Sequence, residues 1–99
     1  SDGSTLNSEM TKDNVWAYPN PVKPEYTGNI TITGLSLNAD IKIVTSNGIL
    51  VNQGRSNGET YIWDGNDLNG KKVTSGIYMV QTATYEGNKG TVCKIAIIR

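Results

Sequence analysis

The residues most able to do chemistry form an acidic and amide-rich run in the middle of the chain. The run consists of Asp64, Asn66, Asp67 and Asn69. Side-chain oxygens at this spacing could hold Ca²⁺, but the run departs from the EF-hand template: Leu68 stands at a ligand position and Ser75 at the glutamate position. Asp and Asn also shape turns by accepting hydrogen bonds from their own backbone. We interpret the run as a turn and predict no metal and no other cofactor.

The chain offers no nucleophile with a base beside it. None of the 99 residues is a histidine, which removes the commonest general base and metal ligand. Cys93, the only cysteine, alternates inward in its strand, so we interpret it as a buried, inert thiol. Ser75 lacks a histidine base too, and Asp64 and Asp67 share one turn instead of facing each other across a glycosidase cleft. We therefore predict no catalytic residue and no enzyme.

Aromatic residues are the remaining candidates for a binding surface. Trp63 shares a strand face with Tyr61, which favours a place in the core over an exposed ring that stacks on a ligand. Trp16, Tyr18 and Tyr26 lie in or after a short, edge-like strand. For these three we leave two interpretations open, ordinary packing or an exposed partner surface.

Composition indicates one small globular domain. Nine basic and nine acidic residues cancel, so no nucleic-acid or anionic-membrane partner is predicted. A run of about 18 apolar residues is missing, so no transmembrane segment is predicted. We expect residues 1–13, which are polar and aperiodic, to be a linker or flexible arm, and residues 14–99 to form the domain. The chain does not begin with Met, and we expect a fragment whose targeting signal lies upstream.

Seven short runs of alternating or aromatic character follow one another along the chain. They cover residues 15–18, 29–33, 40–45, 49–53, 59–63, 76–85 and 91–98. Gly, Asn and Pro separate them roughly every ten residues, and no helical period occurs. The pattern predicts an all-β fold, a seven-stranded immunoglobulin-like Greek-key β-sandwich.

Particular residues are expected to fix this fold. Asn47-Gly48 between two apolar runs predicts a hairpin. Leu35 and Leu37 are expected to close one end of the core. Apolar residues on both faces of 76–85 predict a central strand, or one that a partner covers. Tyr78, near the start of that run, is expected to hydrogen-bond back across the corner, as a tyrosine does in immunoglobulin-like sandwiches.

Several motifs in a fixed order resemble a known family. They are Tyr18-Pro19-Asn20-Pro21-Val22, Ile30-Thr31-Ile32 followed by Gly34-Leu35, Ile41-Lys42-Ile43 leading to Gly48, Trp63-Asp64-Gly65, Gly70, Val73-x-Ser75-Gly76-Ile77-Tyr78, and Lys94-Ile95-Ala96-Ile97-Ile98-Arg99. Over about residues 14–99 the chain resembles the A-type C-terminal sorting domains of type IX (Por) secretion cargo. Within that family it is similar to the final domain of surface proteins built from two-component-regulator-type β-propellers, including the PorZ-like component. The immunoglobulin-like module of flagellar hook-capping proteins is also similar but lacks the basic–apolar–basic tail.

The resemblance implies a function and assigns roles to residues. It implies a non-catalytic sorting or docking domain of a secreted or cell-surface bacterial protein, exported through the periplasm and recognised by the type IX machinery. The recognition tail would be Lys94, Ile95, Ile97, Ile98 and Arg99. The charges of Lys94 and Arg99 would be recognised, and the isoleucines would form the strand. The structural markers would be Pro19, Asn20, Pro21, Trp63, Asp64, Gly65, Gly76 and Tyr78.

Two other functions stay open at this point. The domain could be a structural or interaction module that packs on an upstream β-propeller or on a second copy as a homodimer. It could also be a carbohydrate-binding module that uses Trp16, Tyr18 or Trp63.

Overall fold

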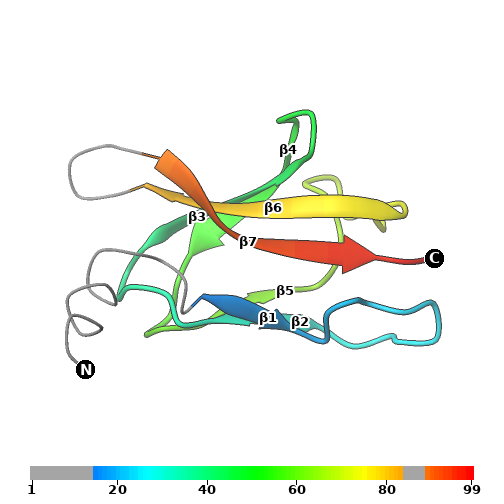
Figure 1. Ribbon diagram of the computed structural model, residues 1–99, viewed down its shortest axis with the longest axis horizontal. Coiled ribbons are helices and arrows are strands. Elements are labelled where there is room, and N and C mark those ends of the chain that lie inside the picture. Colours follow the sequence, from blue (N-terminus) through cyan, green and yellow to red (C-terminus); the bar gives the residue numbers. More distant parts are fainter. Residues whose placement is uncertain (1–14, 84–88) are drawn as a thin grey trace, which may run out of the picture.

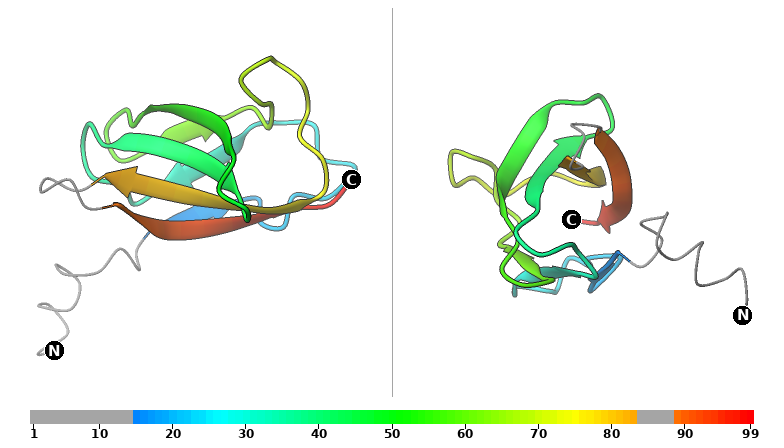
Figure 2. Two further views of the ribbon diagram at one scale, coloured as in Figure 1. Left: turned by 90° about the horizontal axis from the view of Figure 1, so that it is seen from above. Right: turned by 90° about the vertical axis from the view of Figure 1, so that its left-hand side faces the viewer.

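The computed structural model describes residues 15–83 and 89–99, which form a sandwich of two antiparallel sheets (Figure 1). The strands are β1 (Trp16–Tyr18), β2 (Ile30–Thr33), β3 (Asp40–Thr45), β4 (Leu50–Arg55), β5 (Tyr61–Trp63), β6 (Gly76–Ala83) and β7 (Lys89–Ile97). One sheet has the order β1-β2-β5 and the other β4-β3-β6-β7, and Figure 2 shows the two layers from above and from one end. This confirms the predicted seven-stranded all-β sandwich. The predicted linker over residues 1–13 lies outside the described residues.

Alternation at period two builds the core between the sheets. Inward-facing side chains from five strands are almost fully buried: Ile30, Ile32, Ile41, Ile43, Trp63, Tyr78, Val80, Ile95 and Ile97. Each such side chain removed from water contributes about 1.5–3 kcal/mol to the hydrophobic stabilisation of the fold. β6 lies between β3 and β7, which confirms that it is a central strand.

One end of the core differs from the prediction. Leu35 is buried as expected, but Leu37 is 69% exposed, so its predicted place in the core is wrong. A buried hydroxyl occupies that end instead: Ser56 Oγ accepts a hydrogen bond from the Ala39 N–H and donates one to the Ser36 carbonyl, both at 2.8 Å. These bonds hold the turn from inside, and Leu37, within the turn, points outward.

β4 runs further than the sequence predicts. A turn was expected to begin at Gly54, but this glycine lies within the strand. The ring of Tyr61, on β5 of the other sheet, lies against Gly54, and a Cβ atom there would be 2.6 Å from Tyr61 Cε1. Tyr61 Oη donates hydrogen bonds to Asn52 Oδ1 (2.6 Å) and to the Gln53 carbonyl (3.2 Å). The glycine therefore makes room for the ring that joins the two sheets on this side.

We predict that Gly54→Ala lowers the free energy of unfolding by about 1–3 kcal/mol, because the added methyl group overlaps the Tyr61 ring. Urea denaturation of both proteins measures the difference. Gly90→Ala is the matched control, since a Cβ atom at Gly90 has nothing within 4 Å. Equal stability losses for the two variants would contradict the close approach of Tyr61.

Candidate functional site

The predicted recognition tail begins in β7 and continues past its end. β7 lies at the edge of the four-stranded sheet, beside β1 of the other sheet (Figures 1 and 2). Its inner edge pairs with β6. Its outer edge is covered by residues 20–22, which we call the clasp. Asn20 Nδ2 donates a hydrogen bond to the Lys94 carbonyl (2.8 Å), and Asn20 Oδ1 accepts one from the Ala96 N–H (3.1 Å). One amide side chain thus bonds the strand as a backbone peptide group would.

The rest of the clasp continues along the same edge. Val22 and Ile97 form a parallel bridge. The Val22 N–H donates to the Ala96 carbonyl (2.7 Å), and the Ile98 N–H donates to the Val22 carbonyl (2.8 Å). The clasp therefore extends the four-stranded sheet by one short, irregular pairing.

The prolines around Asn20 explain why a side chain makes the first of these contacts. Pro19 and Pro21 have no N–H, so the backbone around Asn20 cannot supply a regular ladder of donors. The asparagine amide carries both a donor and an acceptor and replaces the missing peptide group. The peptide bonds before both prolines are cis.

The end of the tail is held by the connection between β5 and β6. The Arg99 N–H donates to Ser75 Oγ (2.8 Å), and Arg99 Nε donates to the Val73 carbonyl (3.0 Å). Gly65 has a φ of +80°, which side chains rarely adopt, and a Cβ atom there would be 3.7 Å from Arg99 Nη2. The guanidinium predicted to be read by a partner is therefore engaged within the domain.

Trp63 and Tyr78 anchor that connection to the core. Trp63 is 1% exposed, and its Nε1 donates to the Asn66 carbonyl (2.9 Å). Its ring meets Tyr78 edge-on, with the centroids 5.8 Å apart. Tyr78 Oη donates to the Thr74 carbonyl (2.7 Å). The predicted corner bond and the predicted burial of Trp63 are both confirmed, so the indole is not available to stack on a ligand.

The acidic and amide-rich run forms turns, as predicted. Asp64 Oδ1 accepts from the Asn66 N–H (3.0 Å). Asp67 Oδ1 accepts from the N–H groups of Asn69 (2.9 Å) and Lys71 (3.0 Å). Among the residues that the structure describes, no three His, Cys, Asp or Glu side chains gather as a metal site would require.

The other tail residues divide between the core and the surface. Ile95 and Ile97 are buried, whereas Lys94 is exposed and Ile98 is 45% exposed. Within residues 15–83 and 89–99, no side chain forms an ion pair or a hydrogen bond with the Lys94 ammonium. Of the two predicted tail cations, which are both exposed, Arg99 bonds a carbonyl of the domain through its side chain and Lys94 bonds none of the described residues through its ammonium.

Of the three residues considered for an aromatic surface, two are largely exposed and one is not. Trp16 and Tyr18 are 55% and 47% exposed on β1, and their ring centroids are 5.2 Å apart. Tyr26 is half-buried, packs against the core and donates its hydroxyl to the Asn29 carbonyl (2.6 Å). The exposed part of this set is the Trp16–Tyr18 pair.

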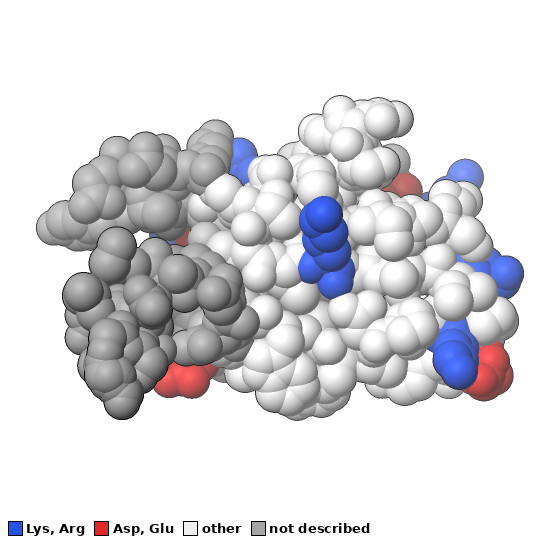
Figure 3. Space-filling model, viewed as in Figure 1, with Lys and Arg blue, Asp and Glu red and all other residues white. Residues whose placement is uncertain are grey.

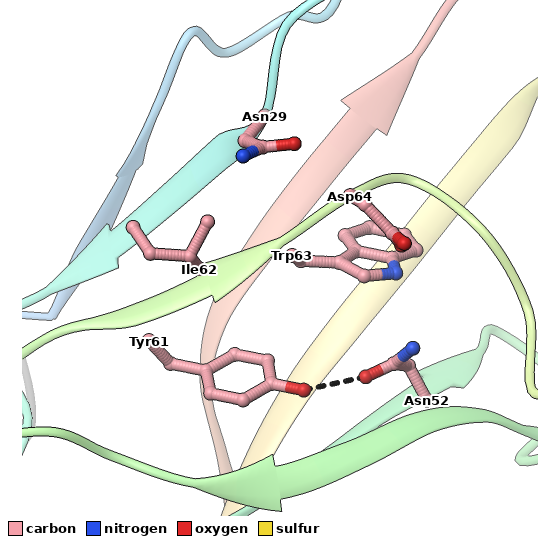
Figure 4. Close-up of a pocket in the computed structure, with 6 residues that line it drawn as sticks. All are labelled: Asn29, Asn52, Tyr61, Ile62, Trp63 and Asp64. Carbon is pink, nitrogen blue, oxygen red and sulfur yellow. Dashed lines mark hydrogen bonds between the residues drawn. The ribbon is translucent and has the colours of Figure 1, made fainter.

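A hollow of about 290 Å³ lies on the side of β5 (Figure 4). It is lined by Asn29, Asn52, Tyr61, Ile62, Trp63 and Asp64. Burial, and then the nearby charge of Asp64, raise the pKa of Tyr61, so the phenol stays protonated and donates to Asn52 (Figure 4). Tyr61 and Asn52 bond each other, and the Asp64 carboxylate accepts from Asn66, so none of these described groups forms a nucleophile–base pair.

Cys93 is half-buried, not fully buried as predicted. It lies opposite the inward-facing Val80, and its Sγ is 3.8 Å from the Lys94 carbonyl oxygen. Burial raises the pKa of the Cys93 thiol, which keeps it protonated and weakly nucleophilic. The prediction of an unreactive thiol agrees with this environment.

Two residues of this site were not assigned their roles from the sequence. Asn20 was assigned only as a structural marker within a family motif. Ser75 was considered at the glutamate position of a calcium loop, as a nucleophile without a base, and as part of a family motif. A polar side chain between two prolines was the available signal, because the backbone there lacks donors. The hydrogen bond of Ser75 to Arg99 had no local signal.

The comparisons with known proteins agree with this arrangement. The sequence model of a family described as the secretion system C-terminal sorting domain matches residues 16–98. The chain belongs to this family. The sorting domain is also similar to a solved structure of PorZ, described as an essential bacterial surface component of the type IX secretion system of Porphyromonas gingivalis. The TM-score is 0.79 and the identity 32%, over 93% of this chain and 12% of PorZ. No match was found among curated proteins.

Membership has direct consequences for function. A sorting domain of this kind marks its protein for type IX secretion, to the cell surface or the surroundings, and is itself non-catalytic. The predicted family, fold and export route are confirmed. The described residues contain no helix long and apolar enough to cross a membrane.

We predict that Tyr78→Phe lowers the free energy of unfolding of the sorting domain by about 1 kcal/mol, because the Thr74 carbonyl loses its donor. Thermal and urea denaturation measure the change. Tyr18→Phe serves as the control, since the Tyr18 hydroxyl is exposed and makes no hydrogen bond within the described residues. An unchanged stability for Tyr78→Phe would argue against the corner bond.

Proposed function

We propose that this sorting domain is the export signal of a longer protein and that the type IX machinery recognises the side of the sandwich where β7 meets β1. PorZ is about eight times longer than the part that this chain matches, which supports a place within a larger protein. The proposal assigns no catalysis to the domain and leaves any activity to other parts of that protein.

The free ammonium of Lys94 is the observation that carries this proposal. Figure 3 shows the face over β1 and β7 as a broad uncharged surface with one basic side chain near its middle. Arg99 uses its Nε and its backbone N–H within the domain, whereas Lys94 points to solvent. A charge that has no partner among the described residues, on a largely neutral surface, is available for a charge-assisted hydrogen bond to a receptor.

We predict that Lys94→Ala lowers export of a reporter fused ahead of the sorting domain by roughly tenfold, as the loss of one charge-assisted contact would. The reporter is measured in the medium and on the cells of a host with a type IX system. Lys94→Arg should keep most of the export because the charge remains.

Lys42→Ala is the matched control, since Lys42 is exposed on β3 of the same sheet but away from β7. Its export should equal that of the unchanged domain. Normal export of Lys94→Ala, together with loss for Arg99→Ala, would move the recognition to Arg99 and contradict the proposal.

The exposed pair of Trp16 and Tyr18 favours a second role on the same side of the domain. Two large rings that lie in contact and half in water are typical of a protein-docking surface. The partner would be an upstream part of the same polypeptide or a second copy of this chain. A carbohydrate partner would have to use this pair too, because Trp63 is buried.

We predict that the double variant Trp16→Ser, Tyr18→Ser leaves the thermal midpoint of the domain nearly unchanged, because surface substitutions shift stability by only about 0.5 kcal/mol. In the full-length protein it should expose the junction before β1 to added protease. Ile49→Ser, at the exposed β3–β4 hairpin, is the control. Unchanged cleavage, with loss of glycan-array binding instead, would replace protein docking with a carbohydrate role.

A further inference from the structure

Four backbone groups along the outer edge of β7 are bonded over the recognition tail. The Lys94 carbonyl, the Ala96 N–H and carbonyl, and the Ile98 N–H bond residues 20 and 22. Ile95 and Ile97 pair with Tyr78 and Gly76 on the inner edge. A strand can be added to a sheet only where N–H and carbonyl groups are free. The clasp therefore leaves no place for an added strand along residues 94–98.

We infer that the secretion machinery reads the tail through the outward side chains of a closed strand edge, and that Asn20 is the positioning residue that keeps this edge closed. The inference rests on the proposed function and names the mode of recognition.

The side chains that remain on the outside define the partner's chemistry. Lys94, Ala96 and Ile98 alternate outward, while Ile95 and Ile97 between them enter the core. On β6, Ile77 lies opposite Ala96 and Met79 lies opposite Lys94 in register, and Ile77 is exposed. A partner that fits this surface is a largely apolar protein surface whose one charge is a carboxylate opposite the ammonium.

A second copy of this chain fits the same surface less well. A two-fold pair centred on this face brings one Lys94 ammonium toward the other, because each subunit presents the same patch. Like charges directly opposed across an interface oppose association. The complementary carboxylate is therefore expected on a different protein.

The edge can open locally because Asn20 is exposed and holds it by two hydrogen bonds at the surface. Losing them frees the Lys94 carbonyl and the Ala96 N–H to water without emptying the core. At Lys94 the strand is then held only from β6, because the remaining clasp bonds, those of Val22, lie further along at Ala96 and Ile98. If the machinery recognises the outward side chains, opening the edge should lower export. If it adds a strand to the edge, opening the edge should raise export.

The experiment uses Asn20→Ala and Asn20→Ser, with Asn47→Ala in the exposed β3–β4 hairpin as the matched control. Amide hydrogen exchange in the 99-residue chain reports the edge. Exchange of the Ala96 N–H should accelerate about tenfold in Asn20→Ala while that of Ile43, in the core, stays unchanged. Export of the fused reporter should fall in the same variant, and Asn20→Ser, whose hydroxyl can make one of the two bonds, should lie between.

Two results overturn the inference, one in hydrogen exchange and one in export. Exchange of the Ala96 N–H at the unchanged rate would show that Asn20 does not close the edge. Export that stays equal while the edge is open would contradict recognition of a closed edge, and export that rises would favour strand addition. If Asn20→Ala unfolds, the milder Asn20→Ser decides by the same two readouts.

Lys94→Ala separates this inference from the proposed function. Reduced export for Lys94→Ala with normal export for Asn20→Ala overturns only the inference that the edge must be closed for recognition. Normal export for Lys94→Ala, with Lys42→Ala as its control, overturns the proposed recognition surface itself.

Discussion

The contact between Trp63 and Tyr78 fixes the two sheets and the connection between them at one point. The indole comes from β5 of the three-stranded sheet and the phenol from β6 of the four-stranded sheet, and they meet edge-on in the core. Each ring also bonds the connection itself, through the carbonyls of Asn66 and Thr74. Apolar burial thus positions a loop that has little apolar surface of its own. Weakening this contact would release the loop and the groups that depend on it.

The tail depends on that loop from one side and on the clasp from the other. Val73 and Ser75 in the loop bond Arg99, and Asn20 with Val22 bonds the strand that precedes it. Motifs that lie far apart in the sequence therefore meet around β7. Their common structural task is to hold one strand so that Lys94 faces solvent.

Much of the fold could be predicted because its signals are local. Alternating isoleucines such as Ile30 and Ile32 define which face of a strand is buried, and Tyr78 acts over four residues. Asn20 reaches the Lys94 carbonyl across 74 residues, and no periodic pattern records such a bond. The prediction for Leu37 was wrong for a related reason, since the Ser56 hydroxyl that bonds this turn follows the end of another strand. Side chain-to-backbone contacts between distant segments are what the sequence conceals.

The clasp follows β1 and bonds to β7, so it joins the first and the last strands that the structure describes. Contacts of such long sequence separation form late in folding, because a large loop must close before they can be made. A chain that stops short of Lys94, or is still being made, lacks the donors and acceptors that Asn20 and Val22 require, and one that stops short of Ile98 lacks the donor for the Val22 carbonyl. The finished β1–β7 side therefore exists only on a complete and folded domain. A receptor that recognises this side would distinguish finished molecules from truncated or unfolded ones without a separate check.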